Sequence, residues 1–242
     1  MHELSAAGRL AAWGTAAFTG AVSPDEAADQ VTGSHDPAHR VLGLPGEETA
    51  VNLPYALARL RSLGAGGLRL VLPRPGDVGG LPGPAAFNER AVARGEAVLT
   101  VGGPPLALLG EGRGIWSVSP VSTDRRTPMS LADAARELDA VMREATALLV
   151  RLDVARWEPA AAEVLAARSE AARPELPMSA DPRAHVVLSQ GLRLTAVVDI
   201  ARAGDGAALT AEEVASRADV LRGLDRAARR AIEAACSAPV GP

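Results

Sequence analysis

Lysine is absent from the chain, and all 25 basic residues are arginine. A Walker A nucleotide site needs a lysine beside the phosphates, a pyridoxal-phosphate enzyme needs one for its Schiff base, and a protein kinase needs one in its third strand. The chain therefore excludes these three reaction classes. A GC-rich genome accounts for the bias itself, because the codons of arginine and alanine are rich in G and C.

Cysteine and aromatic residues are also scarce. The single cysteine, Cys236, excludes an internal disulfide and any zinc site built from several cysteines, and we expect it to be a small buried side chain. Aromatic residues make up 2% of the chain, so Ala, Val and Leu must build most of the core. We expect Trp13, Trp116 and Trp157 to anchor that core rather than to stack on a ligand.

Long apolar segments and a basic surface are missing as well. No segment approaches the roughly 20 apolar residues that span a bilayer, and the N-terminus lacks a basic stretch followed by an apolar one. We therefore expect a cytoplasmic protein with no membrane partner. The formal net charge of −4 argues against nucleic acid as a partner, and the N-terminal helical hairpin carries three acids and no base over residues 23–33.

The first half of the chain reads as a helical hairpin followed by short apolar segments that Gly and Pro interrupt. Helical spacing predicts helices over 4–20, 23–33, 52–63 and 85–94. Apolar runs predict strands over 40–44, 67–73, 97–101, 106–109 and 115–118. These elements predict a small mixed sheet with flanking helices, which we assign to a domain over residues 1–121.

The second half is predicted to be helical. Residues 122–128, "STDRRTP", are polar and end in proline, as a domain boundary does. Helices are predicted over 130–153, 159–172 and 183–203, and from Thr210 to the C-terminal end, with capping boxes at Ser130/Asp133 and Thr210/Glu213. Short connections favour an antiparallel four-helix bundle over residues 129–242. The fold class is thus α+β.

The loop 74–84, "RPGDVGGLPGP", is the first candidate site. A strand that feeds a Gly-rich loop and then a helix can present backbone N–H groups to an anion. The candidate ligand contacts in and after this loop are Arg74, Gly76, Asp77, Gly79, Gly80 and Asn88. Pro82 and Pro84 remove two N–H groups where a phosphate cradle would need them, so a rigid turn without a ligand stays open.

Two further patterns have simpler interpretations. His35, Asp36 and His39 could begin a metal site, but Pro37 interrupts a helix there, so we interpret the segment as a polar loop and expect no metal.

The last predicted helix carries Arg222, Arg226 and Arg229 or Arg230 on one face. Such a row can bind an acidic partner. Pairs with Asp219 and Asp225, together with the helix dipole, explain the row equally well, so we interpret it as a solvated face.

Two segments resemble conserved, uncharacterised proteins of high-GC actinobacteria. They are "LRLVLPRPGDVGGLPGP", residues 68–84, and "LVRLDVARW", residues 149–157. The resemblance covers most of the chain. It implies a cytoplasmic protein and transfers no catalytic residue.

No catalytic motif, cofactor motif or metal motif is present, so catalytic residues cannot be assigned. We interpret the chain as a non-enzymatic interaction or assembly protein that binds another protein or a second copy of itself. The alternative is a binder of a small anionic ligand, or an enzyme, that works through the loop 74–84. A deep pocket lined by convergent charged groups would favour the alternative.

Overall fold

The chain divides into two compact units that are both discontinuous in sequence. The computed structural model describes residues 4–33, 38–123, 128–151, 176–203 and 211–239. The sheet unit comprises Ser5–Pro128, Glu175–Pro182 and Cys236–Pro242, and the helical unit comprises Met1–Leu4, Met129–Pro174 and Arg183–Ala235. The chain therefore returns to the sheet unit twice after leaving it at Pro128.

The sheet unit is built on one mixed sheet of six strands. In chain order the strands are β1 (Arg40–Leu42), β2 (Val51–Asn52), β3 (Gly67–Val71), β4 (Ala97–Val101), β5 (Leu106–Gly112) and β6 (Ile115–Pro120). Their order across the sheet is β2-β1-β6-β5-β4-β3. Only the β1–β6 pair is parallel, and the other neighbours are antiparallel.

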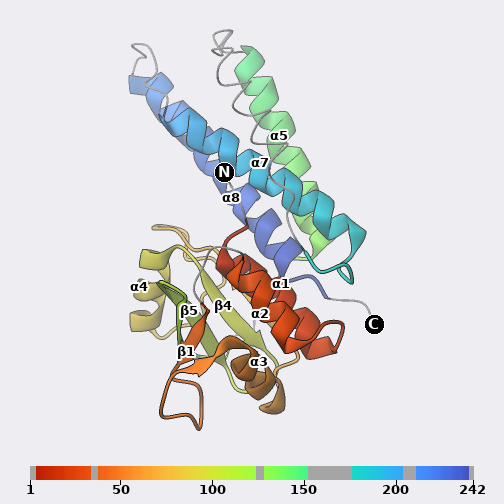
Figure 1. The fold of residues 1–242 in the computed structure, drawn as a ribbon. Coiled ribbons are helices and arrows are strands. Elements are labelled where there is room, and N and C mark those ends of the chain that lie inside the picture. The colour runs from red at the N-terminus through yellow and green to blue at the C-terminus, as the bar shows by residue number, and fades with distance from the viewer. Residues whose placement is uncertain (1–3, 34–37, 124–127, 152–175, 204–210, 240–242) are drawn as a thin grey trace. The chain divides into compact units, whose positions relative to one another are not determined.

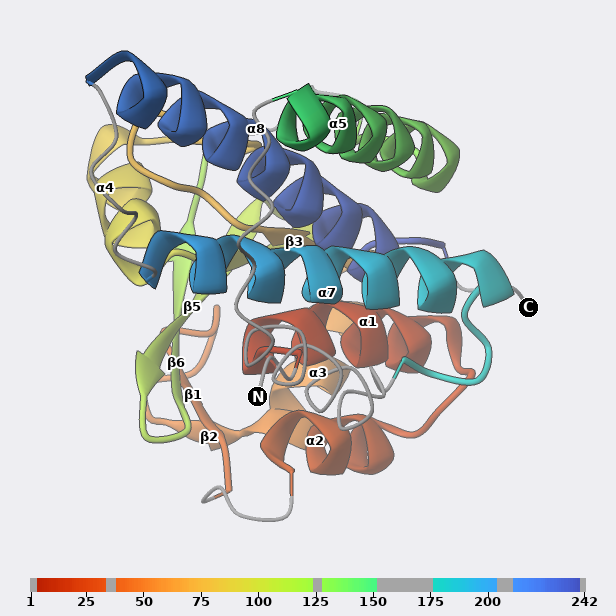
Figure 2. The same ribbon diagram turned by 90° about the horizontal axis from the view of Figure 1, so that it is seen from above.

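Helices cover both faces of this sheet. The helices are α1 (Ala6–Thr19), α2 (Pro24–Thr32), α3 (Leu53–Ser62) and α4 (Ala85–Arg94). Figures 1 and 2 show α4 on one side of the sheet and α1, α2 and α3 on the other. Beneath α4 lies a buried cluster of Val71, Leu81, Phe87, Ala91, Ala97, Leu99, Ala107 and Leu109.

The packing of α1 on the sheet depends on a glycine. A Cβ at Gly14 would lie 2.4 Å from Leu68 Cδ1 on β3 and 3.3 Å from Leu57 Cδ2 on α3. The α1 helix begins at Ser5, whose hydroxyl accepts the Gly8 amide, and ends at Gly20 with a φ of +82°. Both ends follow the usual capping chemistry, so the sequence signals for this helix are local.

The prediction of a small sheet is wrong, because the sheet has six strands. The helix over 85–94 and the strand over 97–101 have the predicted bounds. The strand that the sequence missed is β2, which has two residues and pairs with β1 through Val51 opposite Val41. The parallel β1–β6 pairing then joins this N-terminal pair to the other strands in one continuous sheet.

The prediction of a four-helix bundle is also wrong for the helical unit as described. Its described helices are α5 (Leu131–Arg151), α7 (Pro182–Ala203) and α8 (Ala211–Cys236). A bundle helix carries one apolar stripe, whereas α7 buries Leu192, Leu194, Ala196 and Val198, which project from more than one side. Three predictions fall outside the described residues: the helix over 159–172, the role of Trp157, and the helix start at Thr210.

The start of α5 has one half of the capping box predicted at Ser130 and Asp133, together with a bond between the two side chains. The Asp133 amide donates to Ser130 Oγ at 3.1 Å, and that hydroxyl donates to Asp133 Oδ2 at 2.6 Å. Across the part of the chain that the structure describes, none of the helices combines the length and the apolarity needed to cross a membrane.

Candidate functional site: the loop 74–84 and helix α4

The loop begins with a tight turn. The Arg74 amide donates to the Asp77 carbonyl at 2.8 Å, and the Asp77 amide donates to the Arg74 carbonyl at 2.9 Å. Gly76 has a φ of +80° and follows Pro75, which fits a type II turn. Only glycine takes this conformation without strain, so the Pro-Gly pair fixes the direction in which the chain leaves β3.

The second part of the loop is held to the sheet and to α4. The Leu81 amide donates to the Val78 carbonyl at 3.3 Å, and Arg69 on β3 donates from Nη2 to the Gly80 carbonyl at 3.1 Å. The Gly83 amide donates to Asn88 Oδ1 at 3.0 Å. The loop is therefore braced along its length by bonds within it and by bonds to β3 and α4.

The Arg74 side chain is directed toward Gly95 and Glu96. A Cβ at Gly95 would lie 2.6 Å from Arg74 Nη1, so the guanidinium reaches the glycine that ends α4. Burial raises the pKa of the Glu96 carboxyl, while a hydrogen bond from Ser5 and the charges of Arg74 and Arg9 act in the opposite direction. The positive charge of Arg74 thus partly offsets the effect of burial on the pKa of Glu96.

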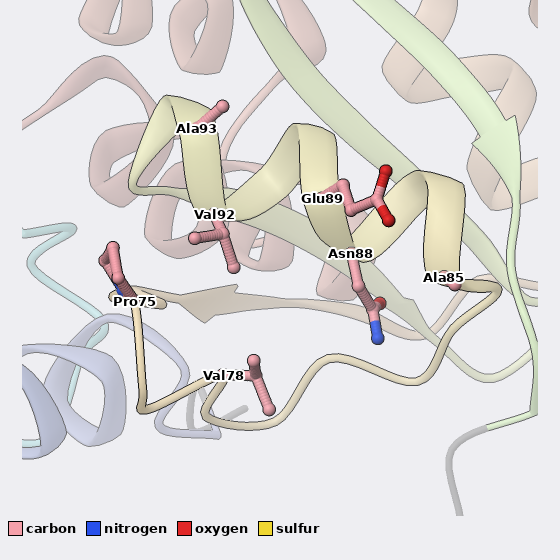
Figure 3. Close-up of a pocket in the computed structure, with 7 residues that line it drawn as sticks. All are labelled: Pro75, Val78, Ala85, Asn88, Glu89, Val92 and Ala93. Carbon is pink, nitrogen blue, oxygen red and sulfur yellow. The ribbon is translucent and has the colours of Figure 1, made fainter.

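An open groove lies between the loop and α4. Its lining residues are Pro75 and Val78 from the loop and Ala85, Asn88, Glu89, Val92 and Ala93 from α4. Figure 3 shows Asn88 and Val92 pointing from α4 toward the loop, with Val78 facing them. Most of the lining is apolar, and Val78 is 50% exposed. We call this surface the loop–α4 groove.

The structure distributes the six predicted ligand contacts around the loop rather than gathering them in the groove. Asn88 is the one of the six that lines the groove, and its amide oxygen already accepts the Gly83 amide. Arg74 and Gly76 are exposed, whereas Asp77, Gly79 and Gly80 are half-buried. Anion binding by these residues stays a prediction, and the internal use of the amides of Arg74, Asp77, Leu81 and Gly83 weighs against it.

Sequence reasoning missed the apolar residues of the groove. The sequence predicts a turn-rich loop at Pro75 and Val78 and a helix over 85–94, and neither prediction marks these side chains as a surface. A signal was present, because a valine in a turn-rich loop has few neighbours that could bury it.

One residue of the histidine segment, which is predicted to be a polar loop, is buried. His35, Asp36 and Pro37 lie outside the described residues, but His39 is 5% exposed and therefore buried. Its Nδ1 accepts a hydrogen bond from Trp116 Nε1 at 3.1 Å. Within the described ranges, His, Cys, Asp and Glu form no group of three or more that could hold a metal ion.

Two expectations about buried side chains are confirmed. Cys236 is a free, buried thiol, and Trp13 and Trp116 are both buried in the sheet unit. They serve packing, as the sequence predicted.

The arginine row on α8 is only partly a solvated face. Arg222 pairs with Asp219, and Arg229 Nε pairs with Asp225 Oδ2 at 2.9 Å, which confirms the predicted pairs along the helix. However, Arg229 is 6% exposed, and Asp225 also accepts Arg202 of α7 at 3.2 Å. A buried arginine with a carboxylate partner is a structural feature of the helical unit, so solvation is the wrong interpretation for this residue.

Together these elements define an α+β protein with a six-stranded mixed sheet, a helical unit and a braced loop beside an apolar groove. The chain belongs to the Rv1486c-like protein family: the N-terminal domain of that family matches residues 7–130, and its C-terminal domain matches residues 132–233. The family takes its name from a mycobacterial protein, in agreement with the actinobacterial resemblance, and its description states no activity. No curated protein and no solved structure matches the chain.

Proposed function

We propose that the protein is a non-enzymatic interaction protein and that the loop–α4 groove is the surface that contacts its partner. One observation carries this proposal. The polar groups of the loop bind one another and the sheet, while the apolar side chains of Pro75 and Val78 face an open groove with Val92. A surface of this kind suits an apolar side chain of another protein better than it suits an anion.

The energetics favour a small or transient contact. Full burial of a valine side chain contributes about 1.5–3 kcal/mol, so covering the exposed half of Val78 would contribute about 1 kcal/mol. The braces on the loop reduce the conformational entropy that binding would otherwise remove. A groove with seven lining residues is smaller than a stable interface of standard size, so neighbouring residues would have to extend the contact.

The proposed partner is another protein or a second copy of the chain. Glu89 in the lining disfavours a phosphate backbone as partner, because it would place like charges together. The proposed location is the cytoplasm, where a free thiol such as Cys236 stays reduced.

A matched pair of variants tests this proposal. Val78→Asp places a charge in the groove, and Val101→Asp makes the same change at the end of β4, where valine is 47% exposed. The partners that co-purify with the chain from its native cells would be quantified for both variants. We expect at least one partner, or the second copy, to be lost with Val78→Asp and kept with Val101→Asp. Equal partner profiles for the two folded variants would reject the proposal.

The anion-binding alternative has its own experiment. A ligand that binds only the native state raises the melting temperature, so inorganic phosphate and nucleotides can be screened by thermal shift. We expect no shift that depends on Arg74. A shift that disappears with Arg74→Ala would favour the alternative.

A further inference from the structure

The lining of the loop–α4 groove contains one charged side chain, which is Glu89. This residue is exposed on α4, and its carboxylate forms no ion pair with any residue that the structure describes. Figure 3 shows it beside the apolar lining residues of the same helix. The groove therefore combines an apolar surface with one negative charge that the chain leaves uncompensated.

The sequence of α4 explains why this charge stays unpaired. Side chains on a helix meet at spacings of three and four residues. The residues at those distances from Glu89 are Ala85, Ala86, Val92 and Ala93, and none of them is charged. Three of the four line the groove, so the positions that could have held a basic partner are apolar instead.

The two arginines of α4 are engaged elsewhere. Arg90 Nη2 lies 2.5 Å from Glu111 Oε1, and Arg94 Nη2 lies 2.5 Å from Glu111 Oε2. The Ser117 hydroxyl donates to the same carboxylate at 2.6 Å. Both guanidinium groups are thus bound to an acid of β5, and the charge of Glu89 is left for a group from outside the chain.

The charge also disfavours a symmetric contact between two copies of the groove. In a two-fold interface the same patch meets itself, so α4 of one copy would face α4 of the other. Such a contact would bring the two Glu89 carboxylates together, and like charges placed together at an interface act against that partner.

We infer that the partner of the loop–α4 groove is a different protein that presents an apolar side chain beside a lysine or an arginine. This inference rests on the proposed function, because it names the chemistry of the partner for the same surface. The apolar side chain contacts Val78 and Val92, and the cationic group pairs with Glu89. The aliphatic stem of a lysine or arginine can lie along an apolar surface while its charge reaches an acid at the edge.

Two short peptides test this inference on the full-length protein. Acetyl-Leu-Arg-amide carries the expected pair of side chains, and acetyl-Leu-citrulline-amide keeps nearly the same shape without the charge. Titration of the ¹⁵N-labelled protein would follow the amide signals of Val78, Glu89 and Val92. We expect the arginine peptide to bind about two- to fivefold more tightly, as an exposed ion pair allows. Added salt should reduce this preference.

Two variants with the same change of net charge complete the test. Glu89→Gln should abolish the preference for the arginine peptide. Glu26→Gln should keep it, because Glu26 is exposed on α2, on the other face of the sheet. Equal binding of both peptides to the wild type, or a preference that persists in Glu89→Gln, would overturn the inference and leave the groove as an apolar docking surface. If neither peptide shifts the groove signals, the proposed function fails and the inference fails with it.

Discussion

Asn88 Oδ1 lies 3.0 Å from the amide nitrogen of Gly83, so the first turn of α4 holds the end of the loop 74–84. On its other side, the Gly83 carbonyl accepts the Ser122 amide at 3.1 Å. Asn88, which the sequence predicted as a ligand contact, therefore stabilises the end of the loop. The rigidity of the loop–α4 groove depends on this bond.

Asn88→Ala should destabilise the sheet unit by about 1–2 kcal/mol, because it leaves a part-buried amide without its acceptor. Asn88→Asp keeps an oxygen at the same place and should cost less than half of that. Urea unfolding of the wild type and both variants measures the difference. Equal stability of Asn88→Ala and the wild type would show that the bond does not hold the loop.

Two glycines inside helices of the helical unit should respond in opposite ways to alanine. A Cβ at Gly191 on α7 would lie 2.9 Å from Ile232 Cγ1 and 3.2 Å from the Ala228 carbonyl oxygen, whereas a Cβ at Gly223 on α8 would meet nothing within 4 Å. Alanine gains about 1 kcal/mol of helix propensity at either site, and overpacking costs about 1–3 kcal/mol. Gly223→Ala should stabilise and Gly191→Ala should destabilise, as thermal unfolding can show. The same sign for both would contradict the close approach of α7 and α8.

Glu96 should make stability depend on pH. Its folded pKa is raised above the ordinary value of 4.5, mainly by burial, so the folded state binds more protons than the unfolded state at pH values just above 4.5. The contribution of Glu96 to stability is therefore fully present below pH 4.5 and is lost as the pH rises through the folded pKa. Glu96→Gln should melt at a higher temperature than the wild type at pH 7, and this advantage should shrink toward pH 4.

Glu111 is the control with the opposite sign. The Ser117 hydroxyl, and then Arg90 and Arg94, hold the pKa of Glu111 below its ordinary value, so its contribution is present above 4.5 and is lost as pH falls through the folded pKa. Glu111→Gln should lower stability at pH 7 by up to about 1 kcal/mol, since the half-exposed arginines are screened by solvent. If Glu96→Gln and Glu111→Gln shift the melting temperature in the same direction at pH 7, the assignment of burial to Glu96 is wrong.

Local signals explain which elements of the fold could be predicted. Gly95, with a φ of +75°, ends α4 where the sequence placed the end, and the apolar run of β4 follows at once. Strand β2 has two residues and no pattern of its own, so only its pairing with β1 reveals it. The number of strands in the sheet could not be predicted from the sequence, because only the pairing with β1 identifies β2.

The same distinction applies to the candidate site. The Pro and Gly residues predicted a rigid turn, and Pro75-Gly76 forms one. The charge of Arg74 acts on Glu96, 22 residues further along the chain, and Asp225 pairs with Arg202, 23 residues before it on another helix. Partners so far apart in sequence leave no pattern that a single chain can show.

Site-specific photo-crosslinking tests the central claim, that the loop–α4 groove contacts another protein. A benzophenone amino acid would replace Val78 in one version of the full-length chain and Val101 in another, since both valines are about half exposed. We predict a protein adduct at position 78 that is absent at position 101 and that Val92→Asp abolishes. The same adducts at both positions, or an adduct at position 78 that persists with Val92→Asp, would contradict the account, as would no adduct at all.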